Sequence, residues 1–124
     1  MIKKIISALI IIAIIFGLYK LLSIPPQNNN YYDNPDLTFY WGNGCPHCEN
    51  VKSYIKNNNI DQKLKINQKE VYKDANNQKE LLDIVSQFCP EIDKTKIGVP
   101  LGFDPVSKKC IQGDQSIIDF LSSK

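Results

Sequence analysis

Two cysteines three positions apart follow a short apolar run and open a segment with a helical pattern. Residues 37–41 are nearly all apolar, as expected of a strand that is covered on both faces. Cys45 then falls at the N-cap of the expected helix, where unpaired backbone N–H groups and the helix dipole favour a thiolate over a thiol. Pro46 falls at the first helical position, where its missing N–H costs nothing, and Cys48 lies one turn further on. The pattern therefore predicts a strand–turn–helix unit with a dithiol at its turn.

The four cysteines of the chain also allow a metal site. Cys45, Cys48, Cys89 and Cys110 make a Cys₄ set, and the first pair has the spacing of a zinc knuckle. A zinc ribbon requires a second closely spaced pair, whereas Cys89 and Cys110 stand 21 positions apart (110 − 89). We therefore predict redox chemistry without a metal for the first pair. The second pair could form a disulfide, remain as buried free thiols or act as a regulatory pair.

The amino-terminal segment is predicted to be a membrane anchor over residues 1–24. Residues 5–24 are mostly apolar and carry no charge except Lys20, and as a helix they would span about 30 Å, close to the hydrocarbon thickness of a bilayer. Lys20 lies near the end, where its ammonium can extend to the headgroups. A cleaved signal peptide is the alternative, because Lys3 and Lys4 form a basic start, but no small-x-small cleavage motif follows.

The lysines also predict the topology and the partners. Lys3 and Lys4 flank the amino end and no lysine or arginine lies between Lys20 and Lys52, so the amino terminus is expected in the cytoplasm and the rest outside. Residues 25–35 are polar and form a tether, and residues 36–124 are enough for one hydrophobic core. The chain has no arginine, and beyond residue 25 it has 12 basic against 13 acidic residues, so no nucleic-acid partner is expected.

Strand and helix signals alternate along the rest of the chain. The first helix is expected to stop at the asparagines 57–59, and alternating apolar and polar residues predict a half-exposed strand from residue 64 toward residue 72. Asn76 or Asn77 is predicted to cap a second amphipathic helix, which ends by Pro90. Two runs, 99–103 and 108–111, are joined by a turn and predict a β-hairpin. A last helix follows.

The resulting order is β-α-β-α-β-β-α, with Asp114 as the expected cap of the last helix. Together with Cys45-Pro46-His47-Cys48, Val99-Pro100 and Gly113-Asp114, it resembles the glutaredoxin branch of the thioredoxin-like superfamily over about residues 37–124. The resemblance implies a four-stranded mixed sheet flanked by helices, with Pro100 in the cis form beside the cysteines.

The resemblance also implies roles for individual residues. The backbone of Val99 would pair with an extended stretch of substrate, while Pro100 leaves no N–H there and keeps the approach to the sulfur open. Trp41, at the end of the first strand, is the third residue predicted to bind substrate. The alternative for Pro100 is an ordinary proline at the start of a strand.

Several departures from the family bear on the substrate. Gly98 stands where dithiol glutaredoxins commonly have threonine, and residues 112–115 and 42–44 also differ from the family pattern, which argues against a full glutathione site. The Pro46-His47 dipeptide instead resembles that of extracytoplasmic disulfide oxidases. A histidine there can donate to the Cys45 sulfur or place positive charge near it, which would make the disulfide a better oxidant.

The combined prediction is a membrane-anchored thiol–disulfide oxidoreductase without a cofactor. Cys45 is the expected nucleophile and Cys48 the resolving thiol. The expected partners are thiols and disulfides of client proteins, and a membrane redox partner that the anchor keeps nearby. The net direction stays open among oxidation, reduction and isomerisation. A non-enzymatic thioredoxin-like or zinc-binding interaction module is the alternative.

Overall fold

The computed structural model describes residues 1–22 and 33–124. Its first helix, α1 (Ile2–Leu22), has only exposed side chains over residues 1–19, and the window Ile2–Tyr19 has a mean hydropathy of 2.2. By length and composition this helix can cross a membrane, a property that signal sequences share. Residues 23–24 of the predicted anchor, residues 25–32 of the predicted tether and the side chain of Lys20 lie outside the described residues.

A four-stranded mixed sheet forms the centre of residues 33–124. The strands are β1 (Leu37–Trp41), β2 (Ile66–Glu70), β3 (Leu101–Asp104) and β4 (Lys109–Gln112), in the order β2-β1-β3-β4. β1 pairs with β2 in parallel and with β3 antiparallel, and β3 pairs antiparallel with β4. The parallel strands β1 and β2 require a crossover connection, which the helix at residues 46–57 supplies. The antiparallel strands β3 and β4 form the predicted hairpin. The predicted mixed sheet is thereby confirmed.

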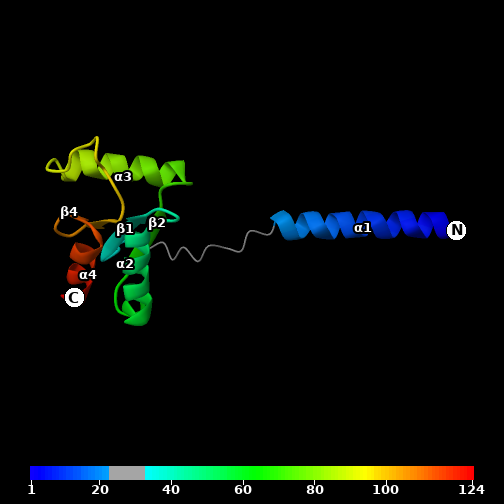
Figure 1. Cartoon of the computed structure of the whole chain (residues 1–124), viewed down its shortest axis with the longest axis horizontal. Helices are drawn as coiled ribbons and strands as arrows, with labels where there is room; N and C mark the ends of the chain where they lie inside the picture. Colours follow the sequence, from blue (N-terminus) through cyan, green and yellow to red (C-terminus); the bar gives the residue numbers. More distant parts are fainter. Residues whose placement is uncertain (23–32) are drawn as a thin grey trace.

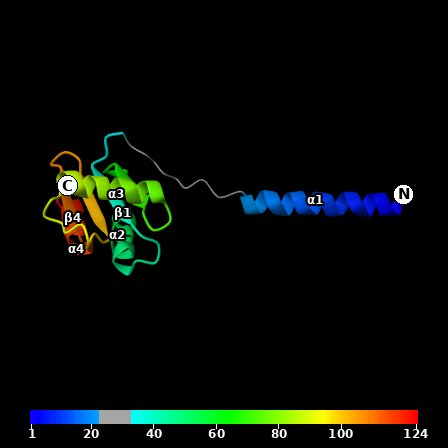
Figure 2. The same ribbon diagram turned by 90° about the horizontal axis from the view of Figure 1, so that it is seen from above.

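Helices cover both faces of this sheet. α2 (Pro46–Asn57) and α4 (Asp114–Ser122) lie on one face and α3 (Ala75–Phe88) on the other; a short 3₁₀ helix, η1 (Ile60–Gln62), follows α2. Figure 1 shows α3 above the sheet with α2 and α4 below it, and Figure 2 looks down on α3 where it crosses the strands. The predicted order of strands and helices is confirmed.

Alternation of side chains along β1 separates two apolar cores. Leu37 and Phe39 face α2 and α4, whereas Tyr40 faces α3, because successive residues of a strand point to opposite faces. The buried residues on the α2 and α4 face are Leu37, Phe39, Cys48, Val51, Ile55, Ile60, Ile66, Ile117 and Leu121. Those on the α3 face are Tyr40, Val71, Leu81, Val85, Cys89, Leu101 and Phe103. Burial on both faces explains why residues 37–41 are so apolar.

The predicted caps of two helices are wrong. Asp74, not Asn76 or Asn77, caps α3, because its Oδ1 accepts the N–H of Asn76 at 2.9 Å and that of Asn77 at 3.1 Å. Gly113, not Asp114, is the N-cap of α4 and has a φ of 92°, which glycine adopts without strain. Asp114 is instead the first residue of the helix.

Three strand starts also differ from the prediction, and the smallest difference is in β4, which covers Lys109–Gln112 instead of residues 108–111. β2 begins at Ile66 rather than Leu64, because the N–H groups of Lys63 and Leu64 both bond to the carbonyl of Ile60 and extend the η1 turn. β3 begins at Leu101, two residues after the predicted start at Val99. The predicted N-cap Cys45 and the helix stop at the asparagines 57–59 are confirmed.

Candidate active site at the carboxyl end of β1

Chain direction brings several predicted residues to one edge of the sheet. The parallel strands β1 and β2 both end at this edge, while β3, which is antiparallel to β1, begins there. β4 runs back again and ends there too. Three residues that are far apart in the sequence therefore lie at this edge: Cys45 after β1, Pro100 before β3 and Asp114 after β4.

Cys45 occupies the N-terminal end of α2. Its Sγ accepts a hydrogen bond from the backbone N–H of Cys48 at 3.2 Å, and the two residues form a disulfide with their Cα atoms 5.3 Å apart. Cys45 is half-buried, whereas Cys48 is fully buried against Val51 and its neighbours. The same N–H that supports the disulfide sulfur would stabilise a thiolate on Cys45, and only Cys45 is open to a second sulfur.

The residues before β3 lie against Cys45. The carbonyl oxygen of Val99 is 3.7 Å from Cys45 Sγ, an arrangement in which a reduced Cys45 thiol can donate to that oxygen. The Val99–Pro100 peptide bond is cis, with Val99 half-buried and Pro100 buried. The structure thus brings Val99, Pro100 and Cys45 together. Pairing of Val99 with a substrate stays a prediction.

His47 turns toward α4. Its Nδ1 lies 3.0 Å from Oδ2 of Asp114, and its side chain is 71% exposed. A carboxylate only accepts hydrogen bonds, so Nδ1 carries the proton in this contact. The predicted action of His47 on the Cys45 thiolate concerns the reduced state and stays a prediction.

Asp114 receives more than this one bond. Asn50 Nδ2 donates to the same oxygen, Oδ2, at 2.7 Å, and the backbone N–H of Gln115 donates to Oδ1 at 3.0 Å. The hydrogen bonds from Asn50 and His47 lower the pKa of Asp114 to about 2. Asp114 is therefore a carboxylate at neutral pH, and it joins the first turns of α2 and α4.

Trp41, the last residue of β1, is half-buried under a lysine. The Nζ of Lys52 lies 3.7 Å from the centre of the indole ring and also bonds to Oε1 of Glu49 at 3.2 Å. This is a cation–π contact between α2 and the strand end that leads into the cysteine loop. The contribution of Trp41 to substrate binding stays a prediction.

Glu70 holds the loop that precedes Cys45, a role that the sequence did not reveal. Its Oε1 accepts the backbone N–H of Asn43 at 3.0 Å and that of Tyr72 at 3.1 Å, and its Oε2 accepts that of Lys73 at 2.7 Å. Burial alone would raise the pKa of Glu70, but these backbone donors bring it below its ordinary value. The carboxylate ties the end of β2 to the turn after β1.

Gly42 in the same loop lies directly against an aromatic side chain. A Cβ at this position would lie 2.3 Å from the ring of Tyr72, which covers the glycine while remaining 63% exposed itself. The backbone of the cysteine loop therefore passes directly beneath an aromatic ring.

The other two cysteines form a second disulfide on the opposite face of the sheet. Cys89 caps the end of α3 and Cys110 lies in β4, with their Cα atoms 5.9 Å apart. Both belong to the core under α3, whereas Cys48 belongs to the core under α2 and α4. The four cysteines therefore do not converge, and the Cys₄ zinc alternative fails on geometry.

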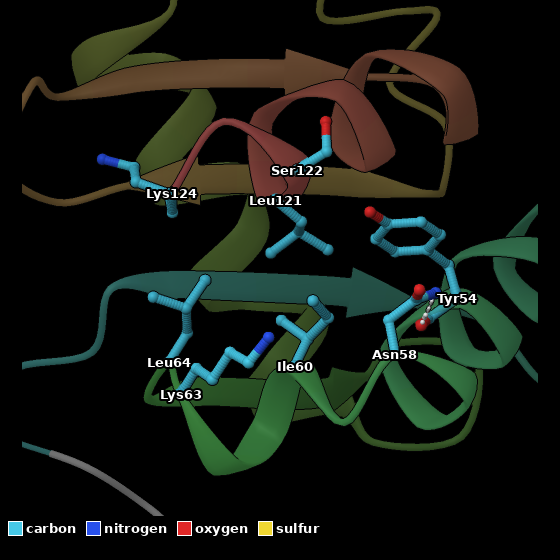
Figure 3. Close-up of a pocket in the computed structure, with 8 residues that line it drawn as sticks. All are labelled: Tyr54, Asn58, Ile60, Lys63, Leu64, Leu121, Ser122 and Lys124. Atoms are coloured by element: carbon cyan, nitrogen blue, oxygen red, sulfur yellow. Dashed lines mark hydrogen bonds between the residues drawn. The ribbon is translucent and has the colours of Figure 1, made fainter.

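A separate cavity lies at the far end of α2. It measures about 280 Å³ and is lined by Tyr54, Asn58, Ile60, Lys63, Leu64, Leu121, Ser122 and Lys124. In Figure 3 these side chains come from the ends of α2 and α4, from η1 and from the residues that directly follow these helices. None of the predicted site residues lines this cavity.

No model of a known protein family matches the chain, and no curated protein matches its sequence. The functional argument therefore depends on the geometry of the Cys45–Cys48 edge.

Proposed function

We propose that the chain is a thiol–disulfide oxidoreductase of the thioredoxin-like type, closest to the glutaredoxin branch, that acts on client proteins. One observation carries the proposal: a half-buried Cys45 sulfur at a helix N-terminus accepts the N–H of Cys48 and is bonded to its buried sulfur. An accessible cysteine at a helix N-terminus that is paired with a protected partner is suited to exchange. The Val99 carbonyl beside the Cys45 sulfur supports the same assignment.

The proposed reaction uses the two sulfurs in fixed order. When a client dithiol is oxidised, a client thiolate attacks Cys45 Sγ, the Cys45–Cys48 bond breaks and Cys48 leaves as a thiolate that takes up a proton. The second client thiolate then attacks the client sulfur of the mixed disulfide, and Cys45 leaves as a thiolate. Reduction of a client disulfide is the same sequence in reverse, with Cys45 attacking and Cys48 releasing the client. The N–H of Cys48 stabilises Cys45 as attacking group and as leaving group.

The position of the domain is part of the proposal. We place α1 in a membrane as an uncleaved anchor, with the amino terminus cytoplasmic and residues 36–124 outside, because Lys3 and Lys4 precede the apolar stretch. A redox partner in the same membrane would then regenerate the pair. A reporter fused after Lys124 that is active only outside the cytoplasm should be active; activity of a cytoplasmic reporter instead would reverse the topology.

Exchange by the full chain in detergent tests the chemistry. Cys45→Ser should abolish reduction of insulin and oxidation of a dithiol peptide, whereas Cys48→Ser should accumulate mixed disulfides with clients, because the resolving thiol is gone. A Cys89→Ala/Cys110→Ser double variant is the matched control, since it also removes a disulfide but on the other face of the sheet. The proposal fails if Cys45→Ser retains exchange, or if the wild-type chain exchanges no disulfides.

A further inference from the structure

Asp114 connects the two helices that meet at the cysteine edge. Its Oδ2 accepts from His47 Nδ1 at 3.0 Å and from Asn50 Nδ2 at 2.7 Å, although these residues lie 67 and 64 positions away in the sequence. Its other oxygen, Oδ1, accepts from the N–H of Gln115 in its own helix at 3.0 Å. One oxygen of the carboxylate therefore accepts hydrogen bonds from α2, and the other accepts one from α4.

This contact occupies the imidazole when Cys45 and Cys48 are bonded to each other. Reduction by a client dithiol transfers two electrons to the pair: the sulfur–sulfur bond breaks, Cys45 becomes a thiolate and Cys48 takes one proton, while the client forms a disulfide and releases its second proton. A negative charge then appears on Cys45, two residues before His47. The Nδ1–H of His47 can donate to that charge only if it leaves Asp114.

We propose that Asp114 is a positioning residue that holds His47 at the start of α4 in the disulfide state and thereby limits the oxidising power of the Cys45–Cys48 pair. The inference depends on the proposed exchange function. An interaction made by the oxidised state and given up by the reduced state stabilises the disulfide against reduction, by linkage. Removing it should make the disulfide easier to reduce, provided that His47 is present.

The measurement is the equilibrium between the full chain in detergent and glutathione buffers. The oxidised fraction of Cys45 and Cys48 is read by alkylation and mass spectrometry of their peptide, which excludes the second disulfide. Asp114→Ala should raise the equilibrium constant for reduction about two- to fivefold, the range expected for an exposed ion pair. Asp114→Asn keeps the size of the side chain and an oxygen for Gln115, so it should show a rise in the same direction with α4 intact.

Two further variants separate positioning from other effects. His47→Leu removes thiolate stabilisation and should lower the equilibrium constant, and Asp114→Ala should have no further effect in the His47→Leu background. Asp119→Ala is the matched charge control, because Asp119 lies on the same helix but bonds to Gln115 Nε2 at 2.8 Å. It should leave the equilibrium constant unchanged.

The outcomes are distinct. A rise caused by Asp114→Ala that is equally large in the His47→Leu background would show direct repulsion between two negative charges and overturn the positioning role. A fall, or no change, in both Asp114 variants would also overturn it. An inert wild-type pair would refute the proposed function and this inference together, whereas an active pair without an Asp114 effect would refute this inference alone.

Discussion

Breaking the Cys89–Cys110 disulfide should destabilise the domain without stopping exchange at Cys45. The bond joins residues that are 21 positions apart, from the end of α3 to β4. Between them runs the segment that carries Val99 and Pro100 to the cysteine edge. In the chain-entropy account, opening a loop of this size lowers the free energy of unfolding by about 3 kcal/mol.

The variant Cys110→Ser isolates this effect. Cys110 is half-buried, so it tolerates a hydroxyl, and Cys89 keeps its sulfur in the core. Adding Cys89→Ala removes a buried sulfur as well and should cost roughly 1 kcal/mol more. Urea unfolding of the full chain in detergent can be followed through Trp41, the single tryptophan of the sequence, which reports on the domain rather than on α1. With a denaturant slope of about 1 to 3 kcal/mol per M, the midpoint should fall by about 1 to 3 M.

A midpoint within about 0.3 M of the wild type would refute the loop-closure reasoning, because even the steepest slope converts that shift to less than about 1 kcal/mol. A lower midpoint together with loss of disulfide exchange, in a variant that is still folded, would show that the second disulfide also positions the Val99–Pro100 segment for the reaction.

Two further predictions follow from polar contacts elsewhere in the domain. Glu80→Gln should lower the free energy of unfolding by about 1 kcal/mol, because Glu80 accepts from the buried Tyr40 hydroxyl at 2.8 Å and from Lys69 Nζ at 2.5 Å, whereas Asp83→Asn at the exposed Lys79–Asp83 pair should have no measurable effect in the same urea titration. Hydrogen bonds from Asn50 and His47 lower the pKa of Asp114 to about 2, so the folded protein gains stability from the ionised carboxylate. This stability is fully present above about pH 4 and is lost as the pH falls from about 4 to about 2. Asp114→Asn should therefore show a shallower loss of stability in that window than the wild type, and equal slopes in acid titrations monitored by Trp41 fluorescence would contradict the assignment.

Local patterns in the sequence were sufficient to predict the order of strands and helices and the position of the Cys45–Cys48 pair. Strand β1 is apolar because both its faces are covered, Cys45 and Pro46 suit the start of a helix, and three asparagines end α2. These features depend on residues within one or two turns of each other. The order of elements and the dithiol at the turn could therefore be predicted without coordinates.

Tertiary structure decided the partners of the polar and sulfur-containing side chains. Asp74 and Asn76 are both good capping residues, and only the path of the chain into α3 selects Asp74. Cys89 and Cys110 allowed three states in the sequence, and the packing of α3 against β4 brings them within bonding distance.

Tertiary structure also decided which side chains surround the loop and helix start that carry Cys45. Glu70 reaches Asn43 across 27 positions, and Asp114 reaches His47 across 67, because four strand ends and two helix starts meet at one edge of the sheet. Periodicity and spacing describe neighbours along the chain, whereas these contacts depend on strand order and direction. The sequence by itself determined that Cys45 lies at a helix start with Cys48 one turn further on, and the fold determined which carboxylates and which carbonyl surround this pair.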